Sequence, residues 1–134
     1  MSDLITEAVP VSKKMIWTGR ILSSIPILLL LLSAVMKFMK PAAVLEGFAR
    51  YGYAEHSIVT IGVLELVCIV LYAIPRTAVL GAILTTAYLG GATATNVRVG
   101  DPSCITTAFL GVLVWAGLHL RDARLRPLLP LTQR

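Results

Sequence analysis

Apolar residues gather in four long blocks, and most polar residues are confined to the chain ends and to the short stretches between the blocks. Each block holds roughly 17 to 21 residues, which at about 1.5 Å per helical residue is enough to cross a hydrocarbon core of about 30 Å. The pattern therefore predicts four membrane-spanning helices, at residues 15–39, 56–74, 75–97 and 102–121.

Prolines and one aspartate refine these helices. Pro26 falls inside the first helix and should bend it. Pro75 suits the first turn of the third helix, and Asp101 followed by Pro102 is typical of the start of the fourth, with the aspartate as N-cap. The second and third helices are therefore expected to form a tight antiparallel hairpin.

The single long connection, PAAVLEGFARYGYAEHS, joins the first and second helices. Aromatic residues alternate in it with charged ones, a pattern that predicts a short amphipathic helix lying in the membrane interface. The fold class is accordingly all-α: an integral membrane four-helix bundle at residues 15–121, with a flexible segment at 1–14 and a basic tail at 122–134.

Composition and charge agree with a membrane protein. The chain is 57% hydrophobic and only 14% charged, which is too apolar for a soluble domain of 134 residues. Its net charge of +5 comes from basic residues that flank the apolar blocks, so lipid headgroups are the expected partners and nucleic acid is not.

The distribution of Lys and Arg predicts the orientation. Eight lie at the chain ends and the turn between the second and third helices, and four lie on the opposite side. The eight are Lys13, Lys14, Arg20, Arg76, Arg121, Arg124, Arg126 and Arg134, and the four are Lys37, Lys40, Arg50 and Arg98. The positive-inside rule then places both termini in the cytoplasm.

Glu65 stands inside an apolar run, where a charge costs about 2.5 to 3.5 kcal/mol on insertion scales and therefore needs a partner. Helices one and three each carry a face that ends in a cation, Lys37 and Arg98. Side chains lean toward the start of their helix, so both cations should lean toward the level of Glu65. The alternative is that Lys37 and Arg98 extend to the headgroups and Glu65 is neutral or paired elsewhere.

Small residues recur every four positions along the third helix, a spacing that lets another helix approach closely and favours packing or a homo-oligomer. They are Ala78, Ala82, Thr86, Gly90 and Ala94. Neither a metal site nor a dithiol is expected. Cys68 and Cys104 lack a CxxC spacing, and neither His56 nor His119 has a second ligand at a suitable distance along the chain.

The string PRTAVLGAILTTAYLGGATATNVRVGDP, with SAVMKF and GVLEL upstream, resembles the DoxX-like family of small four-helix membrane proteins, from about Trp17 to Leu120. The resemblance implies a multi-pass protein of the bacterial cytoplasmic membrane. Relatives in the wider group are linked to membrane redox chemistry, including thiosulfate to quinone electron transfer and, more remotely, vitamin K dependent carboxylation.

The family's features fall on particular residues of this chain. Ser-x-x-x-Lys corresponds to Ser33 and Lys37, Gly-x-x-Glu ends at Glu65, and the closing basic residue is Arg98. Where many relatives have His, this chain has Asn96, so a protonatable imidazole is missing there.

Three classes of function follow. The first is binding of a small lipophilic molecule such as a quinone in an outer-half pocket, with an associated redox role. No cofactor or electron carrier is encoded, so that role needs a partner protein or a diffusible reductant. The second class is a structural or assembly protein whose charges fix helix packing, and the third is a small-solute or proton-coupled transporter. The candidate ligand-binding residues are Ser33, Lys37, Glu65, Tyr88, Asn96 and Arg98.

Overall fold

The computed structural model describes residues 12–128. Its elements are α1 (Lys13–Met39), α2 (Ala42–Tyr51), α3 (His56–Ala73), α4 (Ala78–Val99), α5 (Ser103–Arg121) and a short 3-10 helix, η2 (Ala123–Leu128). Within this part of the chain no strand is present. The expected flexible segment falls mostly on residues 1–11, which lie outside the described residues, as does the tail after residue 128.

Four helices, α1, α3, α4 and α5, are long and apolar enough to cross a membrane, as the sequence predicts. Their outer faces carry large apolar side chains that no other part of the described chain covers, such as Leu28, 63% exposed, and Ile105, 73% exposed. Surfaces of this kind suit lipid rather than water, because lipid tails are as apolar as the side chains themselves.

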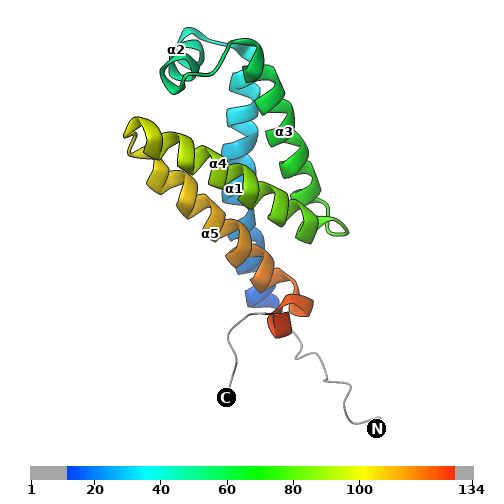
Figure 1. Cartoon of the computed structure of the whole chain (residues 1–134). Coiled ribbons are helices and arrows are strands. Elements are labelled where there is room, and N and C mark those ends of the chain that lie inside the picture. The colour runs from blue at the N-terminus through cyan, green and yellow to red at the C-terminus, as the bar shows by residue number, and fades with distance from the viewer. Residues whose placement is uncertain (1–11, 129–134) are drawn as a thin grey trace.

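Each spanning helix packs on two others. Helix α1 contacts α3 and α5, and α4 contacts the same two helices from the opposite side. The α4–α5 pair leans away from α1 and α3 toward the end that carries α2, so the bundle is closed at one end and splayed at the other (Figure 1). The first turn of α1 and the last turn of α5 lie together at the closed end. Their location in the cytoplasm stays a prediction.

Two helix starts differ from the expectation in instructive ways. Helix α4 begins at Ala78, not at Pro75, because residues 75–77 form the turn and Thr77 Oγ1 donates a hydrogen bond to the Leu71 carbonyl at 2.8 Å. Helix α5 begins at Ser103, yet the Ser103 backbone N–H donates to Asp101 Oδ1 at 2.9 Å. Asp101 therefore accepts a hydrogen bond from the start of α5 as an N-cap side chain would, although the residue directly before the helix is Pro102 and the helix begins one residue later than expected.

The connection between α1 and α3 does contain a helix, α2, and its location in the membrane interface stays a prediction. Left-handed residues bound it, Lys40 with φ 49° and Gly52 with φ 82°. The chain can therefore reverse direction sharply at both ends of α2.

Glycines close the bundle at the end opposite α2. A Cβ atom on Gly81 would lie 2.1 Å from the Tyr72 backbone nitrogen, and one on Gly117 would lie 2.4 Å from Ser23 Oγ. These contacts let the backbones of α3 and α4, and of α1 and α5, approach closely.

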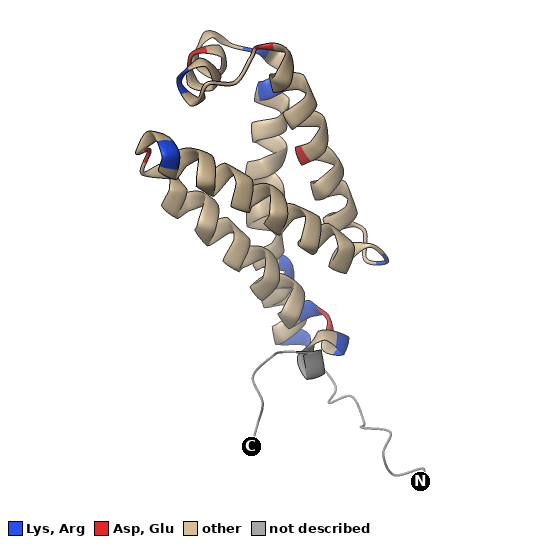
Figure 2. Ribbon diagram, in the orientation of Figure 1, with Lys and Arg blue, Asp and Glu red and all other residues tan. Residues whose placement is uncertain are grey.

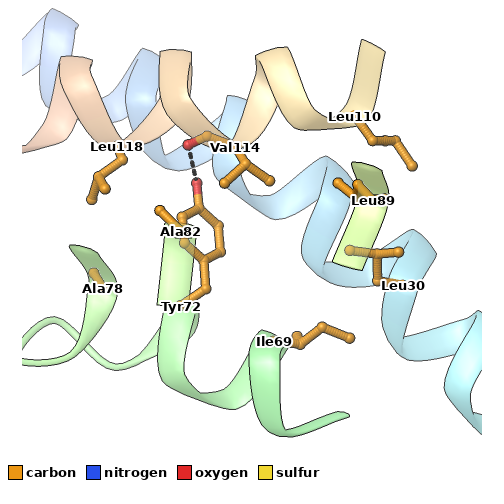
Figure 3. Packing of buried hydrophobic residues seen from close by; sticks show 9 residues of the cluster. All are labelled: Leu30, Ile69, Tyr72, Ala78, Ala82, Leu89, Leu110, Val114 and Leu118. Carbon is orange, nitrogen blue, oxygen red and sulfur yellow. Dashed lines mark hydrogen bonds between the residues drawn. The ribbon is translucent and has the colours of Figure 1, made fainter. Parts of the chain in front are cut away.

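A core of nine buried apolar residues lies next to these glycines (Figure 3). Its members come from all four spanning helices: Leu30, Ile69, Tyr72, Ala78, Ala82, Leu89, Leu110, Val114 and Leu118. The Tyr72 ring spans this core and its hydroxyl reaches the Val114 carbonyl oxygen at 2.7 Å.

Candidate ligand-binding cavity

A buried ion pair links α1 to α3 in the splayed half of the bundle. Lys37 Nζ lies 2.7 Å from Glu65 Oε2 and donates a second hydrogen bond to Ser33 Oγ at 2.6 Å. Glu65 is only 1% exposed and Lys37 8% exposed. Figure 2 shows charged residues gathered at the bundle ends, with an acidic position isolated partway along α3. The expectation that Glu65 is buried with a cationic partner is confirmed.

The local sequence explains how the pair forms. Lys37 lies in the last turn of α1, four residues after Ser33, so both side chains occupy one face. Gly62 lies about one turn before Glu65, and a Cβ atom there would lie 3.2 Å from Lys37 Cβ. The glycine therefore lets the end of α1 approach α3 closely enough for a direct ion pair.

The ion pair borders a partly open cavity of about 520 Å³ that is lined by residues of all five α-helices. Leu30, Leu89 and Leu110 belong both to its wall and to the apolar core, so the cavity sits directly on the core. Tyr88 and Asn96 of α4 also line it, and the Tyr88 side chain interacts with the Glu65 carboxyl group. The cavity therefore combines an apolar floor with a polar wall.

Asn96 is the clearest sign that this cavity could hold a ligand. Its side chain lines the cavity and is 6% exposed, yet within residues 12–128 the carboxamide makes no hydrogen bond. The donor and acceptor groups of this carboxamide are therefore available at the cavity wall. Lys37 also has a third N–H beyond the two that bind Ser33 and Glu65. Hydrogen-bonding capacity therefore remains available at the cavity wall.

Five of the six candidate residues meet at this cavity, and Arg98 does not. Its side chain is exposed and donates to the Tyr51 backbone carbonyl at the end of α2. Two residues along a helix correspond to a rotation of about 200°, so the burial of Asn96 turns Arg98 to the other face of α4. The expected convergence of three charges is a pair, with Arg98 in contact with α2 instead.

Three aromatic residues of the α1–α3 connection also line the cavity: Phe48, Tyr51 and Tyr53. The sequence predicts that they lie in the membrane interface, because alternating aromatic and charged residues are typical of an interfacial helix. The one feature of the sequence that could have indicated a cavity wall is the presence of three aromatic residues in so short a segment. Their contribution to the cavity depends on how α2 folds back, which local pattern does not determine.

The small residues of α4 divide between two environments. Ala78 and Ala82 are buried in the core, whereas Gly90 and Ala94 are exposed and line an outer groove of about 840 Å³ between α4 and α5. Thr86 also borders this groove and accepts a hydrogen bond from Trp115 Nε1 at 2.7 Å. The groove is larger than the cavity, but His119 is its only titratable lining residue among those described. The cavity is thus the better candidate site.

The fold defines an integral membrane protein with four apolar spans and a small helix over the splayed end. The chain belongs to the DoxX-like family, which it matches over residues 21–117. This match covers α3 and α4 completely and most of α1 and α5, and it includes the ion pair and Asn96. No curated protein and no solved structure matched the chain.

Proposed function

We propose that this DoxX-like protein binds a neutral lipophilic molecule of the quinone type in the cavity beside Lys37 and Glu65. The observation that carries the proposal is the unpartnered Asn96 carboxamide in a cavity of about 520 Å³. Because Lys37 and Glu65 neutralise each other, the cavity suits an uncharged ligand better than an anion or a cation.

A carbonyl oxygen fits the available donors. The third N–H of Lys37 and the amide N–H groups of Asn96 can donate to it, and Tyr88 offers a hydroxyl. A cation and a carboxylate next to a quinone carbonyl would polarise it and could exchange a proton with it. Leu30, Leu89 and Leu110 provide an apolar floor for the rest of the molecule.

The setting in the cell belongs to the same proposal. The protein lies in a bacterial cytoplasmic membrane with the closed end in the cytoplasm, where most of its Lys and Arg residues would lie. Any redox role needs a partner protein or a diffusible reductant, because the ligand alone provides no complete electron path. The groove between α4 and α5 offers a surface on which a second copy could pack.

Filling the cavity tests the proposal without disturbing the ion pair. Gly91 lines the cavity, and a Cβ atom there would meet no atom within 4 Å, so Gly91→Leu adds bulk at the cavity wall with no clash at its Cβ atom. Binding of a short-chain quinone analogue to purified protein in nanodiscs should weaken at least about tenfold. Gly90→Leu is the matched control, since Gly90 has equal room but lines the outer groove.

An analogue that binds Gly91→Leu as tightly as the parent protein would contradict the proposal. Asn96→Leu provides a second test, because loss of a hydrogen bond to the ligand should weaken binding by about fivefold to tenfold. Both variants should retain the thermal stability of the parent protein to within a few degrees.

A structural role is the second candidate, and one observation favours it. Lys37 binds both Ser33 and Glu65, at 2.6 and 2.7 Å, as expected for residues that fix helix register. Under this alternative Glu65→Gln lowers thermal stability or oligomerisation, and no quinone analogue binds the parent protein. Saturable binding that Gly91→Leu removes would favour the first candidate.

A further inference from the structure

Helix α2 is the least firmly attached of the five α-helices. It has no buried residue, and its principal contacts are with α4. Its two ends are the left-handed residues Lys40 and Gly52. A rigid segment between two sharp bends can rotate as a unit when its contacts break, because the change is absorbed by few backbone dihedral angles.

Two aromatic side chains of α2, and a third just after it, line one side of the cavity. Phe48, Tyr51 and Tyr53 form a cluster, with ring centroids 6.4 Å apart for Phe48 and Tyr51 and 5.9 Å apart for Phe48 and Tyr53. All three line the cavity. In Figure 1, α2 lies across the gap between the α1–α3 pair and the α4–α5 pair. Moving α2 would therefore remove one wall of the cavity.

Polar contacts hold this wall in place. The Arg98 guanidinium donates to the Tyr51 backbone carbonyl, and Asp101 accepts a hydrogen bond from the Tyr51 hydroxyl at 3.4 Å. Arg50 pairs with Asp101 at 3.5 Å, and the hydroxyl groups of Tyr53 and Thr95 lie 3.0 Å apart. Each contact joins groups at or near the surface, where such interactions are weak and reversible. We call these four contacts the clasp.

We propose that α2 is a lid over the cavity, held shut by the clasp, and that its opening controls exchange of the ligand. The lid deepens the proposed function and rests on it for the identity of the ligand. A closed lid seals the aromatic cluster over the bound molecule. An open lid exposes the cavity on the side away from the closed end of the bundle.

The movement can be tested without any ligand. Nitroxide labels are attached at Glu46→Cys on α2 and Leu80→Cys near the start of α4, two exposed positions outside the clasp. Cys104→Ser prevents labelling of the partly exposed native cysteine, and Cys68 is buried. Arg98→Gln with Asp101→Asn removes most of the clasp, and Asn at 101 can still cap α5. The control is Arg76→Gln, an equal loss of charge in the distant α3–α4 turn.

Double electron–electron resonance in nanodiscs should show one main distance in the parent protein and in Arg76→Gln. The clasp variant should show an added population at a longer distance. Tyr53→Phe with Thr95→Val removes the remaining contact and gives a second variant should the first fold poorly. Distance distributions that superimpose on that of the parent in both clasp variants would overturn the lid.

Ligand kinetics complete the experiment. For a short-chain quinone analogue, the clasp variant should show association and dissociation rates that both rise at least about threefold, because a gate limits passage in both directions. Unchanged rates in a variant whose lid does open would also overturn the proposal. If no analogue binds the parent protein, the proposed function fails, and the distance measurement still decides whether α2 moves.

Discussion

The helices pack in different ways at the two ends of the bundle. At the closed end, glycines bring backbones into contact and the Tyr72 hydroxyl is satisfied by Ser23 Oγ at 3.0 Å and the Val114 carbonyl at 2.7 Å. At the splayed end, a buried ion pair and Asn96 border an open cavity. Polar groups therefore form hydrogen bonds between helices at the closed end, and some remain available to bind a ligand at the splayed end.

This difference follows from where small residues fall. In a membrane, helices associate mainly through close packing, since lipid is as apolar as their side chains. Gly19, Gly81 and Gly117 permit that packing at the closed end. At the splayed end, Gly91 faces open space instead of a neighbouring backbone. The closed end thus provides the stability that allows the other end to hold a cavity.

Gly81→Leu should break the closed end and have the largest effect. A Cβ atom at this position would lie 2.1 Å from the Tyr72 nitrogen and 2.5 Å from the Leu71 carbonyl carbon, so α3 and α4 would have to separate. We expect destabilisation of more than about 4 kcal/mol, which shows as loss of folded protein in size-exclusion chromatography. Gly90→Leu, which adds the same atoms where nothing lies within 4 Å, should remain folded. Equal behaviour of the two variants would contradict the assignment of Gly81 to a close contact.

Lys37→Met tests the splayed end by leaving the Glu65 carboxylate buried without its cation. Breaking one partner of a buried pair costs about 3 to 5 kcal/mol in soluble proteins, and we expect the lower part of that range here. The double variant Lys37→Met with Glu65→Leu should recover much of the loss, because it leaves no unpaired charge. Thermal unfolding in detergent measures both. Additive losses in the double variant would show that the two side chains are not coupled.

Tyr72→Phe removes only a hydroxyl from the closed end. Two hydrogen bonds are lost, to Ser23 Oγ and the Val114 carbonyl, while the ring stays in the core. Thermal unfolding should report a loss of about 1 to 2 kcal/mol. Binding of the quinone analogue should stay unchanged, because Tyr72 does not line the cavity. A variant with the stability of the parent protein but weaker binding would contradict the assignment of Tyr72 to the closed end alone.

The ion pair could be predicted from the sequence but the whole cavity could not, for physical reasons. Depth in the membrane and side-chain direction were enough to bring Lys37 and Glu65 together. The rotation of α4 about its own axis does not follow from these features. The sequence therefore places Arg98 beside the pair, although Asn96, two residues earlier, takes the buried position. A spacing of four residues also turns about 40° per step, so Ala78 and Ala94 lie nearly opposite each other on α4.

The four spans and the cap on α5 could be predicted because length, apolar blocks and Asp101 are local features. The start of α4 is harder to predict. Pro75 is compatible with a helix start, but Thr77 forms a turn there by donating a hydrogen bond to the Leu71 carbonyl. Tyr51 and Tyr53 were recognised as interfacial residues, and their place in the cavity depends on tertiary contacts to Asp101 and Thr95.

The smallest predicted effect concerns pH and the lid. The Ser103 backbone N–H, Arg50 and the Tyr51 hydroxyl stabilise the charged form of Asp101 and hold its pKa below the usual range of an aspartate. Because the pKa is lowered by folding, the contribution of Asp101 is present at neutral pH and is lost as pH falls through that lowered value. The lid population measured by spin labels should therefore open in acid, below about pH 4. Asp101→Asn should show a more open lid at neutral pH and lack this step, whereas an identical acid step in both proteins would show that Asp101 does not cause it.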